Sequence, residues 1–376
     1  MLFASKEVAL LTWKRCATFL IILAIGALAP VCVAGQEVTT SIERKSVPEQ
    51  ADRDARPFLT REGRLRAKPL DWRTTIGKPG PRRNLRVDQG KAATSKGGEP
   101  NPNAIREGQK LYPEEWRYLN QGPRPTTLNY MYDDAPLMFI KVGTADVFTQ
   151  YCEGCAVPTT TYPDAAIGKL FSSSGSCSAS VISGNNAIVT AAHCCYDRGK
   201  KNWVGGWVFA PAYDNGAAPF GTFNWSSATI LTSWITSGDI PSDVCVIRLA
   251  NDSAGRGVTF YTGWLGRSWN FGSVQEHHAL GYPGNLGGGN LLELCTSESF
   301  SPSSACGGGN VLNTGCSMTF GSSGGPWIRS YRGGNWVNSV VHGYDGTTCT
   351  GTFGQTFNGA RFTSGNIFTI CNAAGC

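Results

Sequence analysis

Residues 316–327 read CSMTFGSSGGPW and place two adjacent serines among glycines. Glycine tolerates the backbone of a tight turn, which can expose a hydroxyl while aiming neighbouring N–H groups at one point. In such a turn Ser323 would be a nucleophile, and the N–H groups of Gly321 and Ser323 would bind an oxyanion. A flexible linker is the alternative reading. Pro326 and Trp327 close the glycine run abruptly, which favours the turn.

Two earlier stretches supply the partners that a serine nucleophile needs. The stretch IVTAAHCC, residues 188–195, places His193 after an apolar strand and small residues, and histidine is the natural general base near neutral pH. The stretch SDVCVIRLA, residues 242–250, begins an alternating strand with Asp243. A carboxylate there is costly to bury unless a donor such as a histidine N–H pairs with it. Asp239 is the alternative acid.

The string GSSGG also fits the G-x-S-x-G turn of α/β-hydrolases, so an esterase is a rival interpretation. That fold orders its triad as serine, acid and histidine along the chain. After Ser323 the only histidine is His342 and the only acid is Asp345, in the wrong order and three residues apart. The order His193, Asp243, Ser323, with separations of 50 and 80 residues, instead matches the chymotrypsin arrangement.

The chain therefore resembles chymotrypsin-fold serine proteases. The motifs that carry the resemblance are TAAHC (190–194), SDVCVI (242–247) and GSSGGPW (321–327). AIGKLF (166–171), CSASVIS (177–183) and CSMTFGSSGGPW are more particularly similar to the secreted microbial branch that includes glutamyl endopeptidases. The resemblance covers residues 155–376 and implies a serine endopeptidase with His193, Asp243 and Ser323 as its triad, and no metal or cofactor.

The expected fold is all-β, with two packed antiparallel six-stranded barrels. Short β-branched and aromatic runs alternate with Gly, Ser, Asn and Pro beyond residue 151, which is typical of barrels and sandwiches. Only TSGNIFTICNAAG, residues 363–375, has helical character, so a short C-terminal helix is expected.

The resemblance also points to substrate-binding residues, with two departures from the family. Ser317 replaces the aspartate of trypsin-like members, which argues against selection of Lys or Arg. His342 falls near the histidine with which glutamyl endopeptidases bind an acidic side chain, although Met318 stands where those enzymes have threonine. The strand Val341 to Gly343 would pair with the substrate backbone. Ser322 replaces the aspartate that binds the new N-terminus in digestive members, so that activation device is not expected.

Twelve of the fourteen cysteines lie between Cys152 and Cys376, and this even number in an exported chain favours disulfides. For Cys152 and Cys155 a disulfide is favoured over zinc or redox chemistry. The family resemblance implies the pair Cys177 with Cys194, and it suggests four further pairs: Cys316 with Cys349, Cys295 with Cys306, Cys371 with Cys376, and Cys195 with Cys245.

The N-terminal part differs in character from the rest. Residues 1–35 are interpreted as a signal peptide, because Lys6, Lys14 and Arg15 precede the apolar run 16–34, which ends in small residues suited to cleavage. A retained membrane anchor is the alternative. Residues 36–150 are rich in charge, Pro and Gly and are expected to be a largely disordered pro-segment, or else a linker. Islands such as LYPEEWRYL, residues 111–119, could form helical turns. Residues 151–376 would be the protease domain.

The net positive charge of the chain comes mainly from residues 36–150, which are called the leader below. Residues 36–150 hold 20 Lys and Arg against 15 Asp and Glu, whereas residues 151–376 hold 10 against 11. Nucleic-acid binding is therefore not expected, because it needs a basic face on the folded part. The sequence predicts a secreted monomer, with the periplasm as the alternative location, that acts on proteins or peptides without stable membrane association. A catalytically silent homologue that binds a ligand in the same cleft is the rival function.

Overall fold

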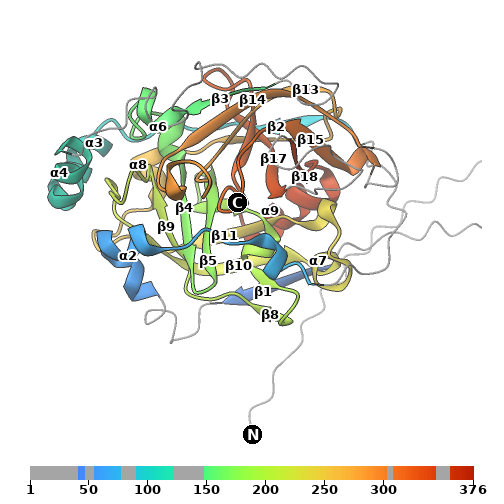
Figure 1. Cartoon of the computed structure of the whole chain (residues 1–376), viewed down its shortest axis with the longest axis horizontal. Coiled ribbons are helices and arrows are strands. Elements are labelled where there is room, and N and C mark those ends of the chain that lie inside the picture. The colour runs from blue at the N-terminus through green and yellow to red at the C-terminus, as the bar shows by residue number, and fades with distance from the viewer. Residues whose placement is uncertain (1–40, 47–54, 78–89, 122–147, 303–307, 344–355) are drawn as a thin grey trace, which may run out of the picture. The chain divides into compact units, whose positions relative to one another are not determined.

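The computed structural model describes residues 41–46, 55–77, 90–121, 148–302, 308–343 and 356–376 (Figure 1). The signal-peptide interpretation concerns residues 1–35, which lie outside these ranges. Among the described residues, no helix combines the length and apolar composition that crossing a membrane would require.

Six antiparallel strands close into a first barrel. They pair in the order β9, β4, β5, β6, β11, β10, and β10 pairs back with β9. Their bounds are β4 Ile167–Ser172, β5 Gly175–Ser183, β6 Ala187–Thr190, β9 Val208–Pro211, β10 Phe223–Leu231 and β11 Cys245–Leu249. All four residues of β6 are buried, because one face fills the barrel and the other is covered by neighbouring elements.

A second barrel of six strands follows in the chain. The order is β16, β13, β14, β15, β18, β17, and β17 closes the ring on β16. The strands are β13 Gln275–Gly281, β14 Glu293–Phe300, β15 Val311–Gly315, β16 Pro326–Arg329, β17 Trp336–Gly343 and β18 Thr356–Ala360. The expected pair of six-stranded barrels is confirmed.

Shorter elements join and extend the barrels. The chain ends in a π-helical turn, Ser364–Phe368, and helix α9, which confirms the expected C-terminal helix. The added strands and helices are β3 Thr149–Cys152, α6 Glu153–Ala156, β7 Tyr196–Asp197, β8 Asn202–Trp203, α7 Thr232–Ser237, α8 Val258–Thr262, β12 Gly266–Trp269 and α9 Thr369–Ala374. Single 3-10 turns occur at Asp164–Ala166, Ala192–Cys194, Ile240–Ser242, Gly287–Gly289 and Gly308–Asn310.

The described parts of the charged leader carry regular structure, which differs from the disorder that their composition predicts. Their elements are β1 Ile42–Ser46, a 3-10 turn Arg56–Leu59, α2 Arg61–Arg66, a 3-10 turn Trp72–Thr74, β2 Ala93–Ser95, α3 Ala104–Leu111 and α4 Pro113–Gln121. Strand β1 adds to β10 and β2 adds to β12. The rest of residues 36–147 lies outside the described ranges.

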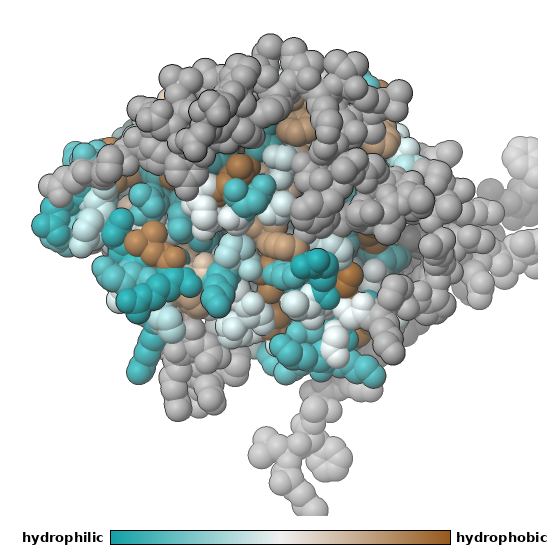
Figure 2. Space-filling view, viewed as in Figure 1, coloured by the Kyte–Doolittle hydropathy of each residue, from teal (hydrophilic) through white to brown (hydrophobic). Residues whose placement is uncertain are grey.

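Contacts with the barrels explain this order. Arg64 is 1% exposed, donates from Nε to the carbonyl of Gly216 at 2.9 Å and forms an ion pair with Glu115 of α4 at 2.5 Å. The indole of Trp116 donates to the carbonyl of Pro219 at 2.7 Å. The amino-acid composition counts these contact residues together with the many charged residues around them. It therefore cannot show that the folded barrels bury and order them. On the face seen in Figure 2, hydrophobic side chains outside the grey region occur in small groups among hydrophilic ones.

Glu293 provides a test of how the second barrel responds to pH. This β14 side chain is fully buried, neither carboxylate oxygen has a partner among the described residues, and burial raises its pKa to about 8. The unfolded chain loses this proton near its ordinary pKa of 4.5, while the folded chain keeps it. Between pH 4.5 and 8 the folded state therefore holds the extra proton, and its stability falls by about 1.4 kcal/mol per pH unit from this group.

Glu293→Gln is expected to remove that loss. Thermal unfolding should show the variant to be more stable than the wild type at pH 8 and nearly equal to it at pH 4. The matched control is Glu298→Gln on the exposed side of the same strand, which should change neither value. Equal pH dependence of Glu293→Gln and wild type would contradict the assignment.

Candidate active site

His193 and Asp243 form a buried hydrogen-bonded pair in the first barrel. Strand β6 ends at Thr190, and a 3-10 turn, Ala192–Cys194, presents the histidine. Asp243 follows a 3-10 turn that precedes β11. Its Oδ1 accepts the backbone N–H of His193 at 2.8 Å, and its Oδ2 lies 2.7 Å from the imidazole Nδ1. Since a carboxylate accepts, Nδ1 carries the proton and Nε2 is left to act as a base.

The rival acid, Asp239, is engaged elsewhere. Its Oδ1 accepts a hydrogen bond from the hydroxyl of Ser242. The structure therefore brings Asp243, and not Asp239, to His193.

His342 lies on the same carboxylate, which the sequence did not reveal. Its Nδ1 donates to Asp243 Oδ2, and its ring meets that of His193 edge-on with centroids 5.6 Å apart. Burial by itself would raise the pKa of Asp243, but the two histidines overcome that effect and hold the pKa well below its usual range. Asp243 thus stays ionised and orders two imidazoles. A strand histidine at 342 gave no local signal of this contact.

Ser323 occupies a turn that packs against the end of β6. Gly321 and Gly324 have φ values of +92° and +79°, which favour glycine. A Cβ on Gly324 would lie 1.9 Å from Thr190 Oγ1, so only glycine permits this approach. The carbonyl of Ser323 accepts the N–H of Ser178 at 2.8 Å and lies 3.9 Å from Cys194 Sγ. The turn therefore sits beside the residue that follows His193.

The hydrogen-bond inventory of this turn leaves two groups unused. The N–H groups of Ser322, Gly324 and Gly325 donate to carbonyls, whereas those of Gly321 and Ser323 have no acceptor among the described residues. The Nε2 of His193 is buried and likewise has no hydrogen-bond partner within the described part of the chain. Ser322 donates its hydroxyl to the carbonyl of Thr319 at 2.7 Å. Its side chain is thus used inside the turn.

Three of the expected substrate-binding residues, Met318, Val341 and Gly343, line one pocket together with Ser323. This pocket is lined by Met318, Thr319, Ser322, Ser323, Val341, Gly343 and Trp72 of the leader. Ser317 lies behind it, and both its N–H and its hydroxyl donate to Oε1 of Gln150, at 3.1 and 2.7 Å. Sequence reasoning missed Gln150, because β3 reaches this site only through its pairing with β14.

Val341 does not offer its backbone to a substrate as expected. Its N–H donates to Gly325 at 3.0 Å, and its carbonyl accepts from Gly324 at 2.8 Å. Both groups therefore hold the Ser323 turn onto β17. The expectation that Val341 pairs with substrate was wrong, because the Ser323 turn already occupies its N–H and its carbonyl.

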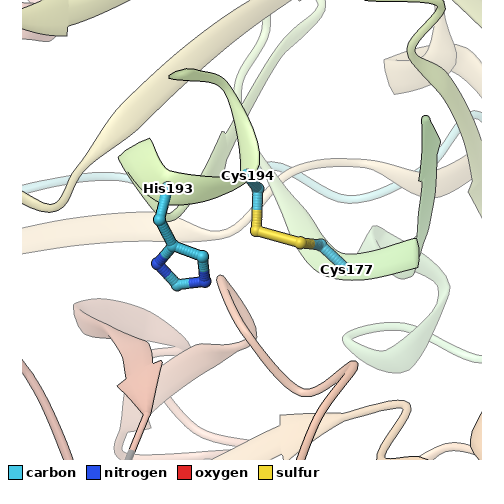
Figure 3. A group of neighbouring side chains, drawn as sticks. All are labelled: Cys177, His193 and Cys194. Atoms are coloured by element: carbon cyan, nitrogen blue, oxygen red, sulfur yellow. A yellow bond between two sulfur atoms is a disulfide. The ribbon is translucent and has the colours of Figure 1, made fainter. Parts of the chain in front are cut away.

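The disulfides confirm some of the expected pairs and correct others. Bonds join Cys177 to Cys194, Cys195 to Cys245, and Cys371 to Cys376, as expected. Cys152 bonds to Cys155, a pairing that the sequence did not assign. Cys295 bonds to Cys316, so the expected pairs Cys295 with Cys306 and Cys316 with Cys349 were wrong. Cys306 and Cys349 lie outside the described residues. Figure 3 shows the Cys177–Cys194 bond beside the His193 ring, where it ties the histidine turn to β5.

The His193, Asp243 and His342 side chains could in principle hold a metal ion, since their ligand atoms lie within 4.8 Å of one another. Two ligand atoms about 2.0–2.1 Å from one tetrahedral zinc would stand roughly 3.3 Å apart. The Nδ1 of His193 is only 2.7 Å from Asp243 Oδ2, which is a hydrogen-bond distance. Cys177 and Cys194, which lie close to His193, are consumed by their disulfide. This geometry fits a proton-transfer site and not a metal centre.

The chain has two closed six-stranded barrels, with a histidine–aspartate pair in the first and a glycine-framed serine between β15 and β16 of the second. These features define the chymotrypsin fold. The proteins that this chain resembles are serine proteases. One is the glutamyl endopeptidase of Bacillus licheniformis, which is 31% identical over 129 residues, or 34% of this chain and 39% of the relative. The chain thus matches about two fifths of that relative's length.

A solved structure gives a similar result. A thermostable serine protease, AL20, from an extremophilic microorganism has a TM-score of 0.50 and 27% identity, covering 56% of this chain and 97% of its own. The protease Anisep from Arthrobacter nicotinovorans has a TM-score of 0.49 and 26% identity, covering 56% and 95%. A scan of protein-family profiles finds no match to the chain.

Proposed function

We propose that the protein is a secreted serine endopeptidase made as a precursor, with Ser323 as nucleophile, His193 as general base and Asp243 as the residue that orients the histidine. The observation that carries this proposal is the buried Asp243–His193 pair, which leaves Nε2 of the histidine without a partner among the described residues, while the adjacent Cys194 Sγ lies 3.9 Å from the Ser323 carbonyl. Secretion is supported by the disulfides and by the apolar run 16–34.

The reaction would proceed in two halves. Ser323 Oγ attacks the peptide carbonyl while His193 Nε2 takes its proton, and the N–H groups of Gly321 and Ser323 bind the oxyanion. The C–N bond then breaks, and His193 returns the proton to the leaving amine. Water attacks the acyl-enzyme by the same route, which releases the acid and restores Ser323. The hydrogen bond between His193 Nε2 and the Ser323 hydroxyl would form when substrate binds, since catalytic hydrogen bonds often close only in the substrate complex.

Hydrolysis of an unfolded protein tests this function and its rival. In the form that lacks the leader we expect cleavage that one equivalent of a fluorophosphonate abolishes and that EDTA leaves intact. Loss of activity with EDTA would instead support metal chemistry at His193, Asp243 and His342. A folded, leader-free protein that neither cleaves nor reacts with the probe would be a silent homologue, and the enzyme proposal would fail.

Preference for Glu before the scissile bond is supported by the sequence likeness to a glutamyl endopeptidase and by the place of His342 beside Gly343 of the pocket. The hydrogen bond of His342 adds a condition. Because its Nδ1 already donates to Asp243, a neutral ring has only an acceptor at Nε2. It could donate to a glutamate carboxylate only when protonated. Glu selection would therefore need the imidazolium form of His342.

This contact gives a test of Glu selection. The ratio of kcat/KM for matched peptides with Glu and Gln at that position cancels effects on the triad. We expect the ratio to reach roughly tenfold or more in the wild type, the size of a charge-assisted hydrogen bond, and to fall toward one in His342→Gln. A ratio near one in the wild type would end the His342 proposal, and a high ratio that persists in His342→Gln would assign Glu binding to another group.

A further inference from the structure

We infer that residues 68–77 of the leader are an intramolecular inhibitor that fills the substrate cleft, with Trp72 seated in the pocket for the substrate side chain. This inference rests on the proposed function, since the cleft has meaning only for a protease. It deepens that function by naming the segment that keeps the precursor inactive.

The segment enters along β5 and crosses the oxyanion site. Ser176 donates its N–H to the carbonyl of Lys68 at 2.8 Å, and Leu70 donates to the carbonyl of Ser176 at 2.9 Å. Between them, Pro69 packs on the Ser323 turn, since a Cβ on Gly321 would lie 3.0 Å from the Pro69 Cβ. Pro69 thus lies against Gly321, one of the two residues whose N–H groups are assigned to the oxyanion.

The Trp72 side chain then packs against the walls of this pocket. It belongs to a buried cluster with Met318 and Val341, lines the space that remains beside Ser323 and is only 9% exposed. The indole packs on Gly343, where a Cβ would lie 2.8 Å from its Nε1. It also contacts the His342 ring, with centroids 5.5 Å apart. A pocket that holds an indole is not narrow, so any selection of Glu would come from charge and not from size.

The backbone of Trp72 explains why the segment is not presented for cleavage there. For attack by Ser323, the carbonyl of the residue in the pocket would have to point at the N–H groups of Gly321 and Ser323. The Trp72 carbonyl instead accepts from Thr75 N–H at 3.0 Å and Ile76 N–H at 3.1 Å, inside its own 3-10 turn. The side chain is bound as in a substrate, whereas the peptide bond is turned away.

The segment leaves the cleft across the loop that follows His193. Arg198 donates its backbone N–H to the carbonyl of Thr75 at 2.7 Å and its guanidinium to the carbonyl of Ile76 at 2.5 Å. Arg73 stacks over Phe320 at 4.7 Å. Ser323 and His193 are 2% and 0% exposed in this arrangement, so no protein substrate reaches them. The segment must be displaced or cut away before the enzyme acts.

The test compares rates at which a fluorophosphonate labels Ser323 in the full chain. Wild type should label slowly. Trp72→Ala removes the buried anchor and should label at least about 30-fold faster, as expected for loss of a central aromatic contact worth about 2 kcal/mol. Trp72→Phe keeps a ring in the pocket and should stay close to wild type. Tyr118→Ala is the matched control, because it removes a leader aromatic that is 36% exposed and outside the cleft.

A peptide of residues 66–77 covers the case in which Trp72→Ala fails to fold. Added to the full chain after proteolytic removal of the leader, it should inhibit competitively, and the same peptide with alanine at 72 should bind at least about 30-fold more weakly. Fast and equal labelling of wild type and Trp72→Ala, or equal inhibition by both peptides, would overturn the inhibitor role and leave the protease function standing. Absence of labelling in every folded form, with or without leader, would overturn both.

Discussion

Ser323→Ala is expected to lower kcat of the leader-free enzyme by about 10⁶-fold and to abolish labelling by a fluorophosphonate. The reason is that no other group can form the acyl-enzyme, while the N–H groups of Gly321 and residue 323 would still bind substrate. KM should change little. The folded structure should persist, because no described hydrogen bond uses the Ser323 hydroxyl.

Ser322→Ala distinguishes the two adjacent serines. The Ser322 hydroxyl donates to the Thr319 carbonyl within the turn. Loss of this hydroxyl should loosen the turn yet leave probe labelling at Ser323. Labelling that survives Ser323→Ala and disappears in Ser322→Ala would show that the nucleophile was assigned to the wrong serine. Mass spectrometry of the labelled peptide identifies the modified residue directly.

Asp243→Asn is expected to lower kcat by about 10⁴-fold. The carboxylate accepts three hydrogen bonds: from the His193 backbone N–H, from His193 Nδ1 and from His342 Nδ1. An amide has one acceptor oxygen and one donor group, so it cannot satisfy all three. Where its NH₂ faces His193, the imidazole must move its proton to Nε2, and the base is lost.

Asp239→Asn is the matched control for this prediction. Asp239 accepts from Ser242 and does not contact His193, so the variant should retain most of the activity. A wild-type rate in Asp243→Asn, or a loss of similar size in Asp239→Asn, would contradict the assignment.

The pH dependence of stability gives separate information on Asp243. Because its pKa is held below the usual value of 3.8, ionised Asp243 stabilises the fold above that pH, and this contribution is lost as the pH falls further.

The candidate site could be predicted from sequence because each of the proposed catalytic groups has a local signature. A glycine-framed serine, a histidine after a buried strand and an acid at the start of another strand are visible in short stretches, and their order along the chain selects one arrangement. The disulfide Cys177–Cys194 was implied by the family resemblance, since Cys194 follows His193. The disulfide Cys371–Cys376 was suggested by the short distance between the two cysteines in the sequence. The strand pattern indicated a barrel or sandwich, and the length of the region together with the family resemblance favoured two barrels.

Other features were settled only by contacts between distant parts of the chain. Pairing of Ser299 with Thr314 brings the start of β14 near the residues after β15, and this register joins Cys295 to Cys316. Packing of β17 against the end of β6 brings His342 to Asp243. The barrel surface orders leader segments whose own composition predicts disorder.

The sequence by itself thus determined the kind of fold and the reactive groups, since both depend on residue type and local spacing. Only the tertiary structure decided which histidines share Asp243, which cysteines bond and where Trp72 lies. These depend on strand register and on surfaces that exist only after folding, and a local pattern contains neither.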